Sequence, residues 1–208
     1  MLSAVAAPLN KRKTCYNKAT LTQYWIPKQG DPDQLNNGKN VTLNGAKTMA
    51  LRTVGGRVIA EVSKLTYKKF QMEGTGLLED GTMVNLDEGQ NTFMTVNRQE
   101  YPYGVGSNGN ALVPWVSVAS NDLPHKSTLY VKHLDGVKLP NGQVHNGCVR
   151  VDDKGWSFGD CQLDFFVLQY TAYERLDSIV PETVDVEQKQ CTVKNYVDAT
   201  VKTWAGLH

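Results

Sequence analysis

Residues 146–167 carry the strongest pattern in the chain, and they read Asn-Gly-Cys-Val-Arg-Val-Asp-Asp-Lys-Gly-Trp-Ser-Phe-Gly-Asp-Cys-Gln-Leu-Asp-Phe-Phe-Val. After an Asn-Gly turn, residues 148–151 alternate polar with apolar side chains, which is typical of a half-buried strand. Residues 162–167 form a second, more apolar strand that contains one carboxylate, Asp164. Because an unpaired carboxylate is costly to bury, an aspartate in this setting is a candidate for chemistry.

Two motifs in this half of the chain resemble the three-aspartate (3D) domain. Asp153-Lys-Gly followed by Leu163-Asp164-Phe-Phe resembles that domain's Asp-Thr-Gly-Gly-Ala-Ile and Ile-Asp-Leu-Phe, with the same eleven-residue step between the aspartates. Upstream, Val118-Ala-Ser-Asn-Asp-Leu-Pro-His-Lys-Ser-Thr-Leu-Tyr-Val resembles the family's Val-Ala-Val-Asp and Val-Tyr-Ile segments. The domain is a double-psi β-barrel that occurs in bacterial lytic transglycosylases of the membrane-bound A type.

The expected fold is mainly β. Many short strands separated by Gly, Asn and Asp turns favour a barrel on periodicity alone. The resemblance implies a six-stranded double-psi β-barrel at about residues 112–170, with an N-terminal elaboration and a few short helices. It also implies that Asp164, the last aspartate of the motif, is the catalytic acid, with Asp153 as its partner. Both aspartates could instead be structural, since such barrels also fold without being enzymes.

Composition limits the possible partners. The chain has 208 residues and a formal net charge of +1. Mixed charges of this kind do not favour nucleic acid or an anionic membrane as a partner, and no apolar run is long enough to span a bilayer. We expect residues 14–208 to form one catalytic domain, monomeric and without a cofactor. Residues 1–13 resemble the remnant of a signal peptide or propeptide, or else a flexible terminus.

The four cysteines favour two disulfides in a secreted chain, because none of them forms a Cys-x-x-Cys metal motif. Three pairings are possible. Cys148–Cys161 would join the two central strands, and Cys15–Cys191 would then tie the two ends of the chain together. Asn40-Val-Thr is an acceptor sequence for N-glycosylation.

A second carboxylate is suggested by the first half of the chain. Residues 56–70 have apolar side chains near helical spacing, so the sequence predicts a helix there. It leads into Met72-Glu73-Gly-Thr-Gly, where glycines allow a sharp turn next to Glu73. Glu73 is therefore a candidate catalytic group, although a solvated residue at a helix end explains it equally well.

Aromatic and polar residues supply the candidate substrate contacts. Flat aromatic rings stack on sugars, and barrel core is the alternative role for the Tyr24-Trp25 pair. Two histidines flank a predicted hairpin, but with no third ligand evident a metal site is not expected. The predicted substrate-binding residues are Tyr24, Trp25, Tyr103, Lys132, His145 and Trp156.

These features favour a secreted enzyme that cleaves bacterial peptidoglycan, as a muramidase or a lytic transglycosylase, of fungal and antibacterial type. A catalytic acid with a raised pKa would protonate the leaving oxygen. Two other classes stay open. One is an expansin-like or endoglucanase-like protein acting on β-glucans, and the other is a secreted protease inhibitor or defence protein without catalysis.

Overall fold

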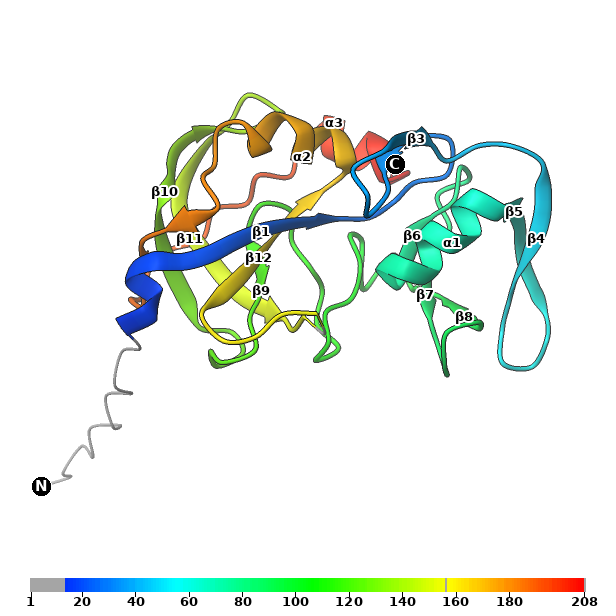
Figure 1. Ribbon diagram of the computed structural model, residues 1–208, viewed down its shortest axis with the longest axis horizontal. Coiled ribbons are helices and arrows are strands. Elements are labelled where there is room, and N and C mark those ends of the chain that lie inside the picture. The colour runs from blue at the N-terminus through cyan, green and yellow to red at the C-terminus, as the bar shows by residue number, and fades with distance from the viewer. Residues whose placement is uncertain (1–13, 156, 208) are drawn as a thin grey trace, which may run out of the picture.

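The computed structural model describes residues 14–155 and 157–207, which form two lobes side by side (Figure 1). The larger lobe is a barrel built from a single sheet with the strand order β13-β1-β12-β9-β11-β10-β14. Its strands are β1 (Ala19–Trp25), β9 (Ser117–Ala119), β10 (Thr128–Lys138), β11 (Val144–Asp153), β12 (Gln162–Leu168), β13 (Thr183–Val184) and β14 (Val186–Glu187).

The barrel closes through one extended segment. β13 pairs with β1 at one edge of the sheet, and β14 pairs with β10 at the other edge. Only Asp185 separates β13 from β14, so counting them as one segment gives the six strands that the sequence predicts. The predicted range of residues 112–170 contains β9 to β12, whereas β1 and the closing segment come from the two ends of the chain.

Apolar residues from every barrel strand fill the barrel. Alternation works as predicted on β10, where Leu129 and Val131 are buried. On β12 the residues from Phe165 to Leu168 are all buried, because that strand lies between two neighbours and is covered on both faces. The two ends of the chain pack here too, through Tyr16 and Val201.

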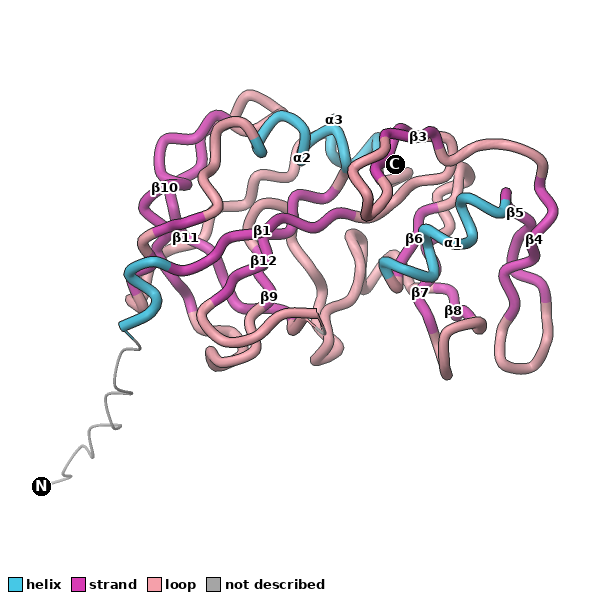
Figure 2. The backbone as a smooth tube through the Cα atoms, viewed as in Figure 1, coloured by secondary structure: helices cyan, strands magenta, loops and turns pink. Residues whose placement is uncertain are grey.

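The smaller lobe has its own core around Phe70, Leu51 and Phe93. Figure 2 shows this lobe as short strands around one helix, joined to the barrel by loops. Its elements are β2 (Pro32–Gln34), β3 (Asn40–Thr42), β4 (Lys47–Arg52), β5 (Val58–Ser63), α1 (Lys64–Glu73), β6 (Thr75–Leu77), β7 (Met83–Leu86) and β8 (Phe93–Thr95).

Three short helical segments complete the described part of the barrel lobe: the 3-10 helix η1 (Thr14–Lys18), α2 (Tyr170–Asp177) and α3 (Ala199–Trp204). Asp198 caps α3 by accepting a hydrogen bond from the Val201 amide at 3.0 Å. No helix within the described residues is long and apolar enough to cross a membrane.

The predicted helix over residues 56–70 is half wrong. Val58–Ser63 is strand β5, which pairs with β4, and only Lys64–Glu73 is helical. Ser63 marks the change, because its Oγ accepts the Thr66 amide at 3.1 Å and so caps α1. Strand β5 is rich in β-branched residues, and this propensity outweighs the apolar spacing that resembled a helix.

All four cysteines form disulfides as predicted, and of the three possible pairings the structure has a different one from the example described above. Cys15 pairs with Cys161, and Cys148 pairs with Cys191. Because β12 lies parallel to β1, with Thr20 opposite Gln162, Cys161 comes next to the chain just before β1. The Cys191 segment runs along β10, where the Cys191 amide donates to Thr128 Oγ1, and so it reaches Cys148 on the paired strand β11.

Candidate active site

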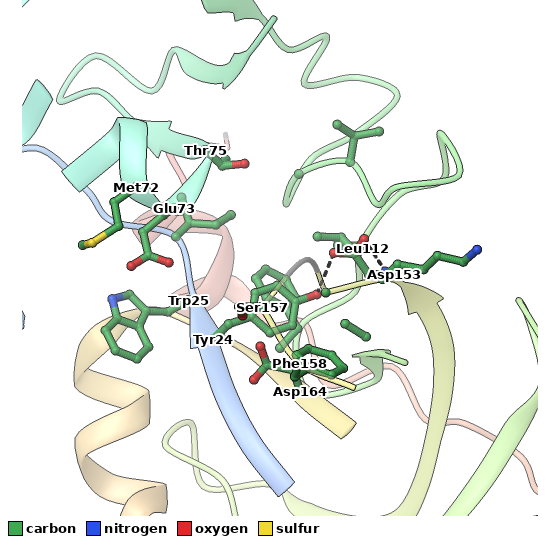
Figure 3. A pocket seen from close by; sticks show the side chains of 17 residues that line it. Tyr24, Trp25, Met72, Glu73, Thr75, Leu112, Asp153, Ser157, Phe158 and Asp164 are labelled. Atoms are coloured by element: carbon green, nitrogen blue, oxygen red, sulfur yellow. Dashed lines mark hydrogen bonds between the residues drawn. The ribbon is translucent and has the colours of Figure 1, made fainter. Parts of the chain in front are cut away.

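A cleft lies where the two lobes meet. Its deeper part is a cavity of about 200 Å³ lined by both lobes, including Tyr24, Trp25, Glu73, Asp153, Phe158 and Asp164. Figure 3 shows Glu73 reaching into it from the end of α1, with Asp164 on the barrel side. The three carboxylates that the sequence singled out therefore line one cavity.

Strand register brings the two aspartates together. Asp153 at the end of β11 and Asp164 on β12 are both register partners of Ala119 on β9. On the other side of β12, Thr22 of β1 is the register partner of Asp164. The row Thr22–Asp164–Ala119–Asp153 thus crosses four neighbouring strands, and residues in register across a sheet share one face. The small side chain of Ala119 separates the two carboxylates.

Asp164 has the electrostatics of a proton donor. Burial is the main reason that its pKa is raised to about 6; a hydrogen bond from Thr22 opposes this effect, and the charges of Glu73 and Asp153 add to it. Thr22 Oγ1 donates to Asp164 Oδ1 at 2.9 Å, and Gln162 donates to Thr22 Oγ1 at 3.1 Å. A carboxyl group with this pKa keeps its proton in mildly acidic solution and can give it to a leaving group.

Asp153 is held by neutral donors. Its Oδ1 accepts the backbone amides of Ser107 and Lys154, both at 2.8 Å, and its Oδ2 accepts the Tyr24 hydroxyl at 3.4 Å. These contacts fix Asp153 in place without neutralising its charge. The preceding residue, Asp152, is buried and bound by Arg150 and Ser117, so it is structural.

Glu73 is placed by the end of its helix. The helix α1 ends in Gly74, which has the left-handed φ of 74° and turns the chain back at once into β6. A β-carbon at position 76 would lie only 2.2 Å from the ring of Phe70, so glycine is required there. The Gly-Thr-Gly turn thus packs against the lobe core and leaves Glu73 at the cleft.

A buried lysine, which the sequence did not single out, holds Glu73. Lys69 is 2% exposed, and its Nζ lies 2.8 Å from Glu73 Oε1 and 3.1 Å from Asp33 Oδ1. Asp33 is also buried, and burial raises its pKa against the opposing effect of Lys69. The spacing of Lys69 and Glu73, four residues apart on one helix, could have suggested this pair. Nothing in the sequence pointed to Asp33.

The predicted aromatic pair lies at the cleft. Burial and the neighbouring Asp153 and Asp164 raise the pKa of Tyr24, which remains a hydroxyl donor. Trp25 donates from Nε1 to Asp33 Oδ1 at 3.3 Å and stacks on Tyr173 with ring centroids 4.7 Å apart. Both side chains line the cavity, and Trp25 is fixed by protein contacts on its ring as well.

Three predicted substrate contacts lie elsewhere. His145 is buried in the barrel core; its Nδ1 accepts the Gly147 amide and its Nε2 donates to the Trp115 carbonyl, and burial lowers its pKa to about 4. Tyr103 is only 6% exposed and packs in the same core, while its neighbour Gly104 lines the cavity. Lys132 is exposed on β10, outside the residues that line the cleft.

Two further residues that the sequence singled out are Trp156 and Asn40. Trp156 lies outside the described residues. Asn40 is exposed on β3, where its side chain accepts hydrogen bonds from Gln34 and Tyr170; its glycosylation stays a prediction. Within residues 14–155 and 157–207 no group of three or more His, Cys, Asp or Glu side chains is arranged to hold a metal ion.

The cavity continues into a wider groove of about 610 Å³ along the smaller lobe. The two spaces share Glu73, Thr75 and Asp153, so they form one cleft. The groove has apolar and charged residues in its lining, and it also presents uncharged polar side chains, among them Gln71, Asn85, Gln90 and Ser107. Amides and hydroxyls of this kind suit a ligand rich in hydroxyl and amide groups.

Comparison with known proteins identifies solved structures that share this fold. No family model matches the chain, and no curated protein matches it in sequence. Among solved structures, E. coli lytic transglycosylase MltA with bound chitohexaose is similar at 13% identity and a TM-score of 0.53, covering 82% of this chain and 71% of that one. The membrane-bound lytic murein transglycosylase of Agrobacterium tumefaciens is similar at 11% identity and a TM-score of 0.52, covering 84% of this chain and 74% of that one. The chain has the fold of these transglycosylases.

Proposed function

We propose that this protein cleaves glycosidic bonds in bacterial peptidoglycan, with Asp164 as the general acid. The observation that carries the proposal is the position of Asp164, which lines a cleft with Glu73 and Asp153 and has a pKa raised to about 6. The fold supports the substrate class, since it is shared with lytic transglycosylases, one of them solved with bound chitohexaose.

Asp164 would supply the proton that the reaction needs. It protonates the glycosidic oxygen as the bond to the anomeric carbon breaks, and an oxocarbenium-like state develops on the sugar. The charge of Asp153, which is fixed beside it, contributes to the raised pKa of Asp164. Tyr24 joins the two by donating to Asp153 while packing on Phe166 of the same strand as Asp164, with ring centroids 5.1 Å apart.

The cleft suits a long polysaccharide. The cavity of about 200 Å³ and the groove of about 610 Å³ together extend over both lobes, which gives an elongated cleft rather than one closed pocket. The two disulfides support an extracellular location, because such bonds persist in oxidising compartments. We therefore include secretion in the proposal. An antibacterial role follows from the proposed substrate, and we further propose that the protein acts as a monomer.

Purified peptidoglycan incubated with the protein, followed by mass spectrometry of the soluble fragments, tests this function. The wild type should release muropeptides, and Asp164→Asn should lower their release by about 10²–10⁴-fold, the usual contribution of a general acid. Asp185→Asn is the matched control: it removes the same charge from an exposed position on the barrel that lies outside the cleft, and it should cleave normally.

Absence of fragments from every form of the protein would overturn the peptidoglycan hypothesis. Release of sugars from β-glucan instead would favour the expansin-like or endoglucanase-like alternative. Equal cleavage of peptidoglycan by wild type and Asp164→Asn would keep the substrate and remove Asp164 from the chemistry.

A further inference from the structure

A buried charge cluster lies directly behind one wall of the cleft. The three ammonium protons of Lys69 match three oxygens: Glu73 Oε1 and the Gln34 carbonyl, each at 2.8 Å, and Asp33 Oδ1 at 3.1 Å. Lys69 and Asp33 are 2% and 1% exposed, whereas Glu73 is 27% exposed and lines the cleft. The cluster therefore runs from the lobe interior to the cleft surface.

Stability alone is a poor explanation for this arrangement. A buried ion pair costs so much desolvation that apolar residues of similar volume often serve the fold as well or better. One oxygen of Asp33, Oδ2, is buried with no hydrogen-bond partner among the described residues, which adds to the cost. A costly cluster that ends on a cleft carboxylate points to a role at the site.

Charge counting shows what the cluster does to Glu73. Two carboxylates share one ammonium ion, so the group carries a net charge of about −1 when both acids are ionised. Because Asp33 takes part of the charge of Lys69, Glu73 is anchored without being fully neutralised. The negative charge of Glu73 acts on Asp164 across the cleft and raises its pKa.

We propose that Lys69 and Asp33 are positioning residues that hold Glu73 as the second catalytic carboxylate, which makes the protein a hydrolase rather than a transglycosylase. This inference rests on the proposed function. A lytic transglycosylase needs only one such acid, because a hydroxyl of the substrate closes a 1,6-anhydro ring. Hydrolysis needs a second carboxylate to activate water.

The hydrolytic step balances with these two groups. Asp164 gives its proton to the leaving oxygen as the bond from that oxygen to the anomeric carbon breaks. Glu73 takes a proton from a water molecule whose oxygen forms the new bond to the same carbon. One water is consumed, a reducing end and an alcohol are released, and proton exchange with solvent restores both carboxyl groups.

The same cluster fixes Trp25 at the cleft. Asp33 accepts the indole N–H at 3.3 Å, and Lys69 Nζ lies 5.1 Å from the centre of the ring. Trp25 and Glu73 are thus held at a set spacing by one buried pair. A sugar that packs against Trp25 is placed relative to Glu73 through the protein interior.

The chemistry of the new chain ends tests the inference, because a purely structural defect cannot change it. Wild type should release reducing ends from peptidoglycan. Glu73→Gln should lower the rate of reducing-end release by about 10²-fold or more, so that the remaining products carry anhydro ends. The double variant Lys69→Met with Asp33→Asn removes both buried charges at once and keeps an acceptor for Trp25. It should show the same change, and adding Glu73→Gln to it should lower the rate little further.

The matched control is the exposed ion pair Lys47–Glu79 in the same lobe, whose side chains are 57% and 58% exposed. Lys47→Met with Glu79→Gln should leave the product ratio unchanged. Glu73→Gln keeps the buried Lys69–Asp33 pair and leaves the core packing intact. If this variant releases reducing ends at the wild-type rate, the inference is overturned. Anhydro ends alone from the wild type would overturn it while the proposed function stands, and no cleavage at all would overturn both.

Discussion

The two lobes hold their cleft carboxylates in different ways. The barrel fixes Asp164 and Asp153 with uncharged donors, namely the Thr22 hydroxyl and two backbone amides. The smaller lobe fixes Glu73 with an ammonium ion, backed by a second buried acid. Uncharged donors leave the pKa of Asp164 to be raised by burial, which suits a proton donor, whereas the ammonium ion holds Glu73 in an ion pair.

Removing the cation that holds a buried carboxylate should give the largest difference between the two lobes. Lys69→Met leaves Asp33 buried without its ion-pair partner, which we expect to cost about 3–5 kcal/mol in the free energy of unfolding. Arg150→Met in the barrel should cost less, because Arg150 is 31% exposed whereas Lys69 is 2% exposed. Urea denaturation of both variants measures the difference. Equal losses would show that the two lobes tolerate a missing cation alike.

Both disulfides lie in the barrel, so covalent cross-links stabilise that lobe, and the two bonds should contribute unequally. In the chain-entropy account, Cys15–Cys161 closes 146 residues and contributes about 5 kcal/mol, whereas Cys148–Cys191 closes 43 and contributes about 4 kcal/mol. Paired Cys→Ser variants, compared by thermal or urea unfolding, should differ by about 1 kcal/mol in that order. The opposite order would mean that local strain or residual structure outweighs loop length.

The barrel half of the site is local in sequence, and this made it predictable. The eleven-residue step from Asp153 to Asp164 spans two strands that flank β9, so a short motif encodes two neighbouring positions of the site. Thr22 completes the row from 142 residues away. The sequence does not predict this contact, because the parallel pairing of β1 with β12 is a tertiary feature. The same pairing brings Cys161 next to Cys15.

The lobe half of the site depends on burial, which sequence shows poorly. Lysine and aspartate are mostly exposed residues, so Lys69 and Asp33 read as surface positions. His145 shows the converse: it lies beside the motif in sequence and is polar, which suggests a substrate contact, whereas its two ring nitrogens satisfy backbone groups in the core. Both cases depend on which side chain finds a buried partner.

The negative charge of the smaller lobe should be visible in the pH dependence of cleavage. Asp164 must be protonated to act, so kcat/KM should fall as the pH rises through about 6. Glu73→Gln removes an anion that raises this pKa, so the fall should begin at lower pH in that variant. The pH–rate profile of the residual activity measures it, with the exposed Glu79→Gln as control. An unmoved profile would mean that Glu73 does not act electrostatically on Asp164.

The smallest change tests the barrel's uncharged donor, and it should act in the opposite direction. Thr22 Oγ1 donates to Asp164 Oδ1 at 2.9 Å and so lowers the pKa of that carboxyl. Thr22→Val keeps the shape and removes the donor, which should raise the pKa of Asp164 and move the fall in kcat/KM to higher pH. The loss in stability should be only about 0.5–1.5 kcal/mol.

Thr22→Ser keeps the hydroxyl and should leave the profile at the wild-type position. The pH–rate profiles of Thr22→Val and Glu73→Gln should therefore shift in opposite directions. Shifts in the same direction would contradict this, because Asp164 would then be responding to a general disturbance of the cleft. Opposite shifts would instead show that the hydroxyl of Thr22 on β1 lowers the proton affinity of Asp164 and that the carboxylate of Glu73 at the end of α1 raises it, alongside burial and Asp153.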